Sequence, residues 1–279
     1  MLPADDLTSH ALDLLERRVP FCQATVVAAG DAASADVGQK LIVPYAGAPM
    51  GVIGDDALTQ TVAAVAAEQL LAGDVRLVQF HTGGNDGAAG DRRARRAGEL
   101  EAGAVEVALE PMPPPDQLII VGAGHIAQPL ARIAGVVGFE VTVIDDRERF
   151  ANRERFPDAA HVVVDAFDHA IAAQQITPWT YLVLVTRGHE HDEPVLQHVA
   201  ASPAPYIGMI GSRRRVLLVF ERLRARGVPD HFVERIFAPI GLDIGARTPE
   251  EIALAIMAEI VNVKRGGKAS SLTHLLRRV

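Results

Sequence analysis

Residues 117–127 read "QLIIVGAGHIA", an apolar run that ends in two closely spaced glycines. A strand followed by a glycine turn and a helix is typical of a βαβ unit that binds a dinucleotide. Gly122 permits a tight turn, Gly124 lets a pyrophosphate approach the backbone, and Ala127 supplies the small third residue of the motif. Asp145 ends the next apolar run, where its carboxylate could accept hydrogen bonds from ribose hydroxyls. The stretch therefore predicts a nucleotide-binding edge on a parallel sheet.

The residues after this turn repeat the same alternation. Helical stretches separate further apolar runs, which read "FEVTVID", "AHVVVDA", "TYLVLVT" and "APYIGMIG". This alternation predicts βαβ units. The last helix is indicated by the capping box "TPEE" (residues 248–251) and by an apolar stripe of Ile252, Ile256 and Ile260. We therefore predict an α/β protein whose residues 117–279 form a Rossmann-like, doubly wound parallel sheet.

A smaller domain is predicted before "PMPPPD" (residues 111–116), whose prolines favour an extended linker. Residues 1–110 contain runs typical of strands, which read "FCQATVVAAG", "QKLIVPY", "MGVIG", "VRLVQF" and "AVEVALEP". The stretch "ALTQTVAAVAAEQLLAG" predicts a helix, with caps at Asp55 or Asp56 and at Gly73, and an apolar face of Leu58, Val62, Val65 and Leu70. We expect a small α+β domain, in which the Gly- and Arg-rich residues 80–103 are mobile.

The composition excludes several classes of protein. The net charge of -8 and the pI near 5.7 argue against general nucleic-acid binding, which needs a basic surface. No stretch approaches the ~20 apolar residues of a membrane span, and the N-terminus lacks the pattern of a signal peptide. Cys22 is the single cysteine, which excludes a disulfide framework and a multi-cysteine metal site. We therefore expect a cytoplasmic protein with no nucleic-acid or membrane partner.

Ionisable residues gather just after the apolar run "TYLVLV", where "TRGHEHDE" occupies residues 186–193. Charges past a strand end lie where open α/β sheets bind their ligands, and several predicted strand ends meet at this edge. We therefore expect one ligand-binding crevice there. Its candidate cofactor-binding residues are Gly122, Gly124, His125, Asp145, Arg187, His189, Asp192, Ser212, Arg213 and Asp243.

Two parts of this crevice allow more than one interpretation. The sequence "GSRRR" (residues 211–215) offers backbone amides and guanidinium groups for an anion, or else lines a solvated helix start. In an extended loop, His189 and His191 would face the same side, which suits a metal completed by Asp192 or Asp243. Surface histidines in a polar loop would give the same pattern, so whether a metal binds stays open.

A set of stretches in the same order resembles the xanthine dehydrogenase accessory factor family, also called XdhC/CoxI. They read "GAGHIAQPLA", "VIDDR", "TRGHEHDEPVL", "YIGMIGSRRR" and "PIGLDIGARTPEEIALAIMAEI", and they span almost all of residues 116–265. The resemblance implies a small N-terminal domain followed by a Rossmann domain. It also implies an accessory protein that binds molybdenum cofactor, as molybdopterin or its dinucleotide form, and delivers it to a molybdenum hydroxylase such as xanthine dehydrogenase. The implied partners are the apo-hydroxylase, a cysteine desulfurase and cofactor-synthesis enzymes.

The N-terminal half departs from the family pattern. Where members show "GSSPRxPG" and a later "GGGC" turn, this chain reads "GDAASADVGQK" and "GVIGDDAL", and "LEAGAVEV" replaces a second "CGG" motif. Two other functions are compatible with the residues, an NAD-dependent oxidoreductase and a nucleotide-sensing scaffold. The first lacks a recognisable general acid beside a substrate pocket. The oligomeric state, including a homo-oligomer, stays open at this point.

Overall fold

The structure is a computed structural model that describes residues 4–81 and 100–271. The chain divides into two compact units, Met1–Pro114 and Pro115–Val279. In the described ranges, no helix is both long enough and apolar enough to cross a membrane.

The N-terminal unit is an antiparallel sheet with helices. Its elements are α1 (Ala4–Glu16), β1 (Phe21–Ala29), β2 (Lys40–Pro44), β3 (Met50–Gly51), α2 (Asp56–Ala72), β4 (Arg76–His81) and β5 (Ala104–Met112). The described strands have the order β3-β2-β1-β5-β4, and α2 contacts β1 and β5. Asp55 and Gly73 cap α2 as the sequence predicts. The buried face of α2 includes Leu58, Val62 and Leu70, whereas Val65 is only partly buried.

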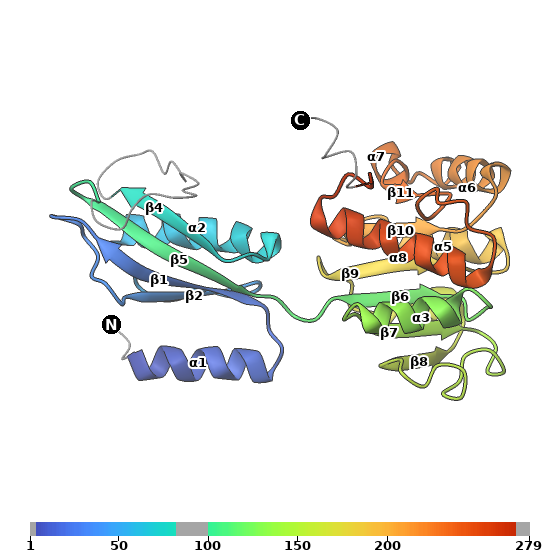
Figure 1. The fold of residues 1–279 in the computed structure, drawn as a ribbon, viewed down its shortest axis with the longest axis horizontal. Helices are drawn as coiled ribbons and strands as arrows, with labels where there is room; N and C mark the ends of the chain where they lie inside the picture. The colour runs from blue at the N-terminus through green and yellow to red at the C-terminus, as the bar shows by residue number, and fades with distance from the viewer. Residues whose placement is uncertain (1–3, 82–99, 272–279) are drawn as a thin grey trace. The chain divides into compact units, whose positions relative to one another are not determined.

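The C-terminal unit is a parallel sheet with helices on both faces (Figure 1). Its elements are β6 (Gln117–Val121), α3 (Ala127–Val136), β7 (Glu140–Asp145), β8 (His161–Val164), α4 (Phe167–Ala172), β9 (Thr180–Leu184), α5 (His189–Val199), β10 (Tyr206–Met209), α6 (Arg213–Ala225), α7 (Asp230–Val233), β11 (Ile236–Phe237) and α8 (Pro249–Arg265). The described strands have the order β11-β10-β9-β6-β7-β8, so β6 lies between β7 and β9.

The two faces of this sheet are covered by different helices. Leu118 and Ile120 of β6 belong to the core beneath α3 and α8, which lie on the near face in Figure 1. Ile119 and Val121 belong to the opposite core, beneath α4, α5 and α6. Successive strand residues point to opposite faces, so a strand covered on both sides is apolar throughout. The prediction of a doubly wound α/β sheet is confirmed, and Ile256 and Ile260 of α8 are fully buried in it.

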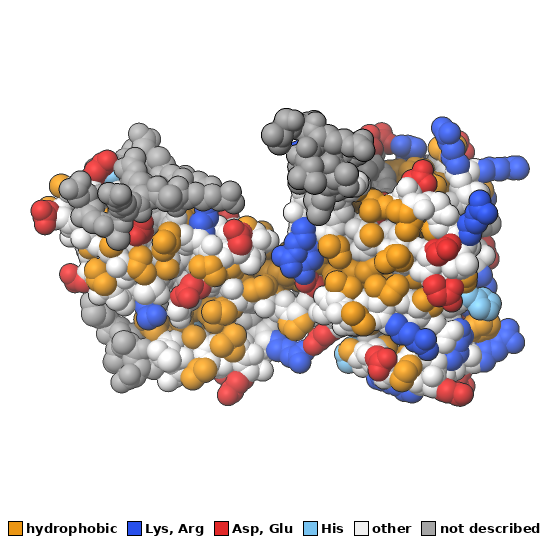
Figure 2. Space-filling model, in the orientation of Figure 1, with side chains coloured by type: hydrophobic (Ala, Val, Ile, Leu, Met, Phe, Trp, Pro, Cys, Tyr) orange, Lys and Arg blue, Asp and Glu red, His pale blue; other side chains and the backbone are white. Residues whose placement is uncertain are grey.

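Charged side chains of both signs lie on the face of the C-terminal unit that Figure 2 shows. The Lys and Arg side chains, in blue, are interspersed there with the Asp and Glu side chains, in red (Figure 2). A phosphate backbone is bound by a continuous basic surface, and a mixture of signs does not provide one.

The structure corrects the predicted element boundaries at several positions. Strand β5 continues through Pro111, into the predicted linker. Since β4 starts opposite Leu109, β5 has only β1 as a neighbour at Pro111, where a missing amide is tolerated. The predicted mobile segment 80–103 starts too early, because Phe80 is buried in β4, and residues 82–99 lie outside the described part.

Two further differences concern elements near the N-terminus. Helix α1 is missing from the sequence-based prediction, although Leu7, Ala11 and Leu14 recur at helical spacing and are buried in one core with Phe21 and Ile42. The stretch "MGVIG" contributes a strand of only two residues, β3.

Candidate functional site

The glycine turn after β6 uses its two glycines for different purposes. Gly122 has a φ of +105°, and a Cβ atom there would lie 2.6 Å from the carbonyl oxygen of Val185. Its amide donates to the carbonyl of Ile144 at 2.7 Å, so the turn is packed between the ends of β7 and β9. A Cβ atom at Gly124 would meet nothing within 4 Å. Gly122 is therefore needed for packing, and Gly124 leaves the backbone open to a ligand.

Asp145 holds this turn in place from the end of β7. Its side chain is fully buried, and its carboxylate accepts hydrogen bonds from the Ala123 amide at 2.8 Å and from Arg147 Nε at 2.8 Å. The Arg147 amide and second guanidinium nitrogen also donate to it. Burial acts to raise the pKa of Asp145, but these hydrogen bonds outweigh it and lower the pKa. All acceptor positions of the carboxylate are thus occupied, in contrast to the ribose-binding role predicted from the sequence.

The next residue, Asp146, pairs with Arg187 from the loop after β9. Arg187 Nη1 donates to Asp146 Oδ1 at 2.9 Å, and Nη2 donates to Oδ2 at 2.7 Å. The two side chains are 41% and 31% exposed, so this bidentate pair lies at the surface of the sheet edge. The structure therefore links Arg187, a predicted site residue, to a carboxylate that the sequence did not single out.

Asp192 is a buried residue of helix α5, not an exposed loop residue. It lies in α5, is fully buried, and accepts hydrogen bonds from the hydroxyl of Thr186 and the guanidinium of Arg215. Burial raises the pKa of Asp192, although both donors act to lower it. The neighbouring carboxylate of Glu193 binds Arg222 of α6 at 2.8 Å. These ion pairs join α5 to α6, so Asp192 and Glu193 of "HEHDE" serve helix packing in this structure.

The extended loop expected at residues 186–193 is wrong, because α5 begins at His189. Residues two apart in a helix lie at different angles around its axis, so the strand-like alternation behind the predicted metal pair does not hold. The ring of His191 packs against Phe167, with 5.0 Å between the ring centroids. Among the described residues, no group of three or more His, Cys, Asp or Glu side chains could hold a metal ion.

The remaining predicted residues lie at separate positions. Ser212 is the N-cap of α6, where its hydroxyl accepts from the amide of Arg215 at 3.3 Å. Arg213 is exposed in the first turn of α6, and Asp243 is exposed between β11 and α8. Neither Arg213 nor Asp243 is the ion-pair partner of Arg187 or Asp192, which bind Asp146 and Arg215 instead. One nitrogen of Arg215, Nε, is buried without a hydrogen-bond partner in the described part of the chain.

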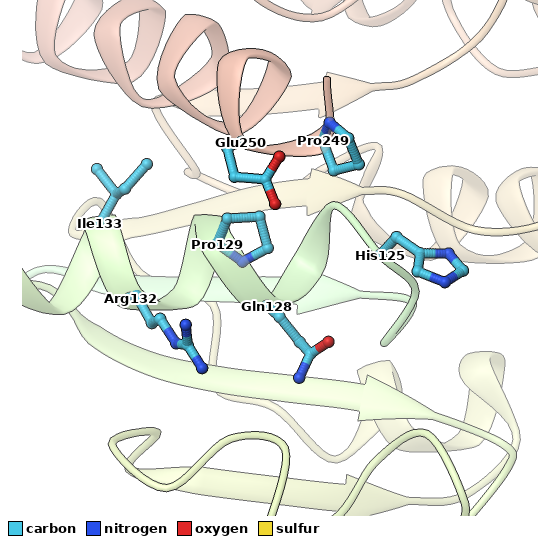
Figure 3. A pocket seen from close by; sticks show the side chains of 7 residues that line it. All are labelled: His125, Gln128, Pro129, Arg132, Ile133, Pro249 and Glu250. Atoms are coloured by element: carbon cyan, nitrogen blue, oxygen red, sulfur yellow. The ribbon is translucent and has the colours of Figure 1, made fainter. Parts of the chain in front are cut away.

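A groove of 390 Å³ lies beside the glycine turn, between α3 and the start of α8 (Figure 3). This volume is within the range of small-molecule sites. Gln128 and Arg132 extend on one side of Pro129, and Glu250 lies on the other (Figure 3). The residues that line the groove are His125, Gln128, Pro129, Arg132, Ile133, Pro249 and Glu250. His125 therefore connects the groove to the glycine turn.

The family model described as the XdhC Rossmann domain matches residues 118–260, and the model of the XdhC and CoxI family matches residues 14–81. The chain belongs to the XdhC/CoxI family. The resemblance inferred from the motifs is thereby confirmed, and the matched ranges fall in the two units that the structure separates.

Several relatives carry different names. This XdhC/CoxI chain is 29% identical to an uncharacterized protein, YqeB, of Escherichia coli, over 96% of this chain and 49% of that protein. It is 32% identical to a protein of Bacillus subtilis named as a probable xanthine dehydrogenase subunit, over 56% of this chain and 44% of that protein. It is 27% identical to the molybdenum cofactor insertion chaperone PaoD of Escherichia coli, over 53% and 40% respectively. The chain thus spans less than half the length of these relatives.

The fold also matches a solved structure. A crystal structure described as a xanthine dehydrogenase from Bacillus halodurans superimposes with a TM-score of 0.50 at 20% identity, covering 95% of this chain and 97% of that one. At this identity the match supports the fold alone.

Sequence reasoning placed Asp146, Arg147, Thr186 and Arg215 within its motifs but did not predict that they hold the site together. Asp146 and Arg147 stand next to Asp145 in "VIDDR", so the motif located them without distinguishing their roles. Which of two adjacent carboxylates is buried depends on the packing of the glycine turn, and no local pattern reports it.

Proposed function

We propose that this chain binds molybdenum cofactor as cargo and delivers it to a molybdenum hydroxylase. The observation that carries the proposal is the open backbone at Gly124, where a Cβ atom would meet nothing within 4 Å. Amides at such a turn and at the start of α3 are suited to a phosphate group. Family membership and the name of the relative PaoD support the identity of the cargo.

The residues near this opening can supply charge to the phosphate of the cofactor. Arg187 lies in the loop after the neighbouring strand β9, and Arg213 is exposed at the start of α6. Asp145 fixes the turn through the Ala123 amide and acts by positioning. The cargo carries a phosphate both as molybdopterin and in its dinucleotide form, so the same turn is suited to either form.

The proposal includes protein partners. Delivery requires an apo-hydroxylase of the xanthine dehydrogenase type. The cofactor would reach this chain from cofactor-synthesis enzymes, and a cysteine desulfurase would supply its sulfur. The name of the Bacillus subtilis relative supports an association with xanthine dehydrogenase.

The test compares Gly124→Asp with wild type, each co-expressed with a molybdenum hydroxylase. Bound metal and cofactor would be measured by metal analysis and mass spectrometry after purification. We expect wild type to carry the cofactor and Gly124→Asp to lose it, because a carboxylate at the turn repels phosphate. Gly135→Asp is the matched control, since Gly135 lies in the helix that follows the turn and a Cβ atom there also meets nothing within 4 Å. Wild-type protein without cofactor, or equal loading of all three proteins, would refute the proposal.

A further inference from the structure

The ion pair between Asp146 and Arg187 crosses the edge of the sheet at the glycine turn. Asp146 directly follows β7, and Arg187 lies three residues after the end of β9. Strands β7 and β9 flank β6 on its two sides, and the glycine turn leaves from the carboxyl end of β6. A ligand that extends across this edge, as in doubly wound sheets generally, therefore meets the Asp146–Arg187 pair.

This pair can be opened at small cost. Both side chains are partly exposed, at 41% and 31%, and exposed ion pairs contribute little to stability. The guanidinium fork of Arg187 already binds a planar carboxylate through two nitrogens, and the same fork matches two oxygens of a phosphate. A phosphate can therefore replace Asp146 as the partner of Arg187 without a change in the donor geometry.

The adjacent carboxylates differ in their capacity to exchange partners. Asp145 is fully buried and accepts hydrogen bonds from Ala123 and Arg147 on both oxygens. Releasing it would disrupt the turn itself. Asp146 is held by Arg187, with Arg147 Nε farther away at 3.6 Å. Asp146 is thus the carboxylate at the end of β7 that a ligand's hydroxyl groups can reach.

We propose that Asp146 and Arg187 form an exchangeable clasp for a ligand of the nucleoside diphosphate class. A ligand phosphate takes the place of Asp146 on Arg187, and the ribose hydroxyls take the place of Arg187 on Asp146. In the ligand-free site, Asp146 thus occupies the position of the ligand phosphate, and Arg187 occupies the position of the ribose hydroxyls. The clasp rests on the proposed function, because it assigns the ligand chemistry of the same sheet edge, and it favours cargo that carries a nucleotide.

The test uses two kinds of probe, inorganic pyrophosphate and nucleoside diphosphates, which carry the same phosphoanhydride together with a ribose and a base. Binding of inorganic pyrophosphate and of ADP, CDP and GDP, each in turn, would be measured by calorimetry on the full chain. Asp146→Ala should tighten pyrophosphate about fivefold, because the competitor for Arg187 is gone. The same variant should weaken the nucleoside diphosphate that binds wild type by about tenfold or more, because the ribose loses its acceptor. Arg187→Ala should weaken both probes by at least about tenfold.

Asp230→Ala is the matched control for the change of charge. Asp230 forms an exposed ion pair with Arg224, at 2.6 Å between Arg224 Nε and Asp230 Oδ1, in the same unit of the chain. We expect Asp230→Ala to change the affinity for either kind of probe by less than twofold. The opposite shifts in Asp146→Ala are specific to the clasp, since a general electrostatic effect moves both probes in the same direction.

The outcomes separate the clasp from the proposed function. If Asp146→Ala shifts both probes in one direction, or shifts neither, or if wild type binds neither probe, the clasp is refuted. In that case, wild type that co-purifies with cofactor and loses it in Gly124→Asp leaves the proposed function standing. If Asp146→Ala shifts the two affinities in opposite directions but wild type never carries cofactor, the clasp is upheld and the delivery of cofactor is refuted.

Discussion

Cys22 is a fully buried thiol in β1, where it pairs in register with Pro111 of β5 and Val43 of β2. Burial raises the pKa of Cys22 to about 12. Thiolate is the form that binds metals and attacks reagents, so this thiol is inert at neutral pH.

We predict that the native protein does not react with thiol reagents and that Cys22→Ala retains its cofactor. The variant should lose only about 1 kcal/mol of unfolding free energy, since a small side chain replaces another small one. The measurement compares bound molybdenum, reagent uptake and thermal unfolding in both proteins. Loss of the metal in a folded Cys22→Ala variant would show that the thiol is a ligand.

Asp145 makes the stability of the protein depend on pH in the acid range. Its pKa in the folded state lies below the ordinary value of 3.8, because its hydrogen bonds from Arg147 and Ala123 outweigh the effect of burial. As the pH falls below about 4, the unfolded chain therefore binds a proton at Asp145 before the folded chain does. The stability that the Asp145 carboxylate contributes above about pH 4 is lost as the pH falls further. Protonation also weakens the hold of Asp145 on the glycine turn.

We predict that the unfolding free energies of wild type and Asp145→Asn differ most at neutral pH and converge below about pH 4. Urea denaturation at a series of pH values measures this difference. Asp243→Asn serves as the control for the loss of a carboxylate, because Asp243 is exposed, and its unfolding free energy at neutral pH should lie within ~0.5 kcal/mol of wild type. A constant gap between wild type and Asp145→Asn would contradict the assigned role.

At the scale of elements, the two glycines of the turn between β6 and α3 have different roles: Gly122 is needed for packing, and Gly124 gives a ligand access to the backbone. Gly122→Ala places a methyl group 2.6 Å from the carbonyl oxygen of Val185, in a backbone conformation with a φ of +105°. We predict a loss of about 2–4 kcal/mol in unfolding free energy for this variant. Gly124→Ala meets no atom and should unfold within ~0.5 kcal/mol of wild type while binding cofactor more weakly. Thermal unfolding and metal analysis of both variants test the distinction, and equal stabilities would contradict it.

The contact between α5 and α6 leads to a prediction that differs from the sequence-based one. If residues 186–193 formed an exposed loop, replacing Asp192 would leave stability nearly unchanged. In the structure its carboxylate is fully buried and paired with Arg215. Removing one member of a buried pair leaves the other uncompensated, so we predict that Asp192→Ala lowers the unfolding free energy by about 2–4 kcal/mol. Chemical denaturation measures this loss, with Asp243→Ala at an exposed position as the control. Equal unfolding free energies for wild type and Asp192→Ala would mean that the pair contributes nothing.

At the scale of the whole molecule, delivery of a cofactor and catalysis of hydride transfer require different groups in the protein. Hydride transfer needs an acid or base within hydrogen-bond reach of the substrate. In the described part of the chain, His125 is exposed without a hydrogen-bond partner that would orient it, and His191 packs against Phe167. We predict that the purified protein does not turn over common metabolites with NAD or NADH. Absorbance at the nicotinamide band measures this, and steady turnover that Gly124→Asp abolishes would favour the oxidoreductase.

Much of the C-terminal unit could be predicted from local patterns. Fully apolar runs indicated the strands of a sheet covered on both faces, "TPEE" indicated the capping box at Thr248, and "VGAGHIA" indicated the turn into α3. Helix α5 could not be recognised in the same way. Its first turn is charged, and Pro194 lies inside the helix. The helix is held by ion pairs of Asp192 and Glu193 with arginines of α6 and by the buried side chains of Val195, Leu196 and Val199.

The sequence by itself determined the alternation of strands and helices in the C-terminal unit, the position of the glycine turn and the membership of the family, because each follows from residues that are neighbours in sequence. Only the tertiary structure decided that Asp145 locks the turn while Asp146 meets Arg187, and that Asp192 is a buried partner of Arg215. These roles depend on side chains that are distant in sequence and meet only when parallel strands place their carboxyl ends at one edge. Their burial and charge balance are therefore properties of the assembled sheet.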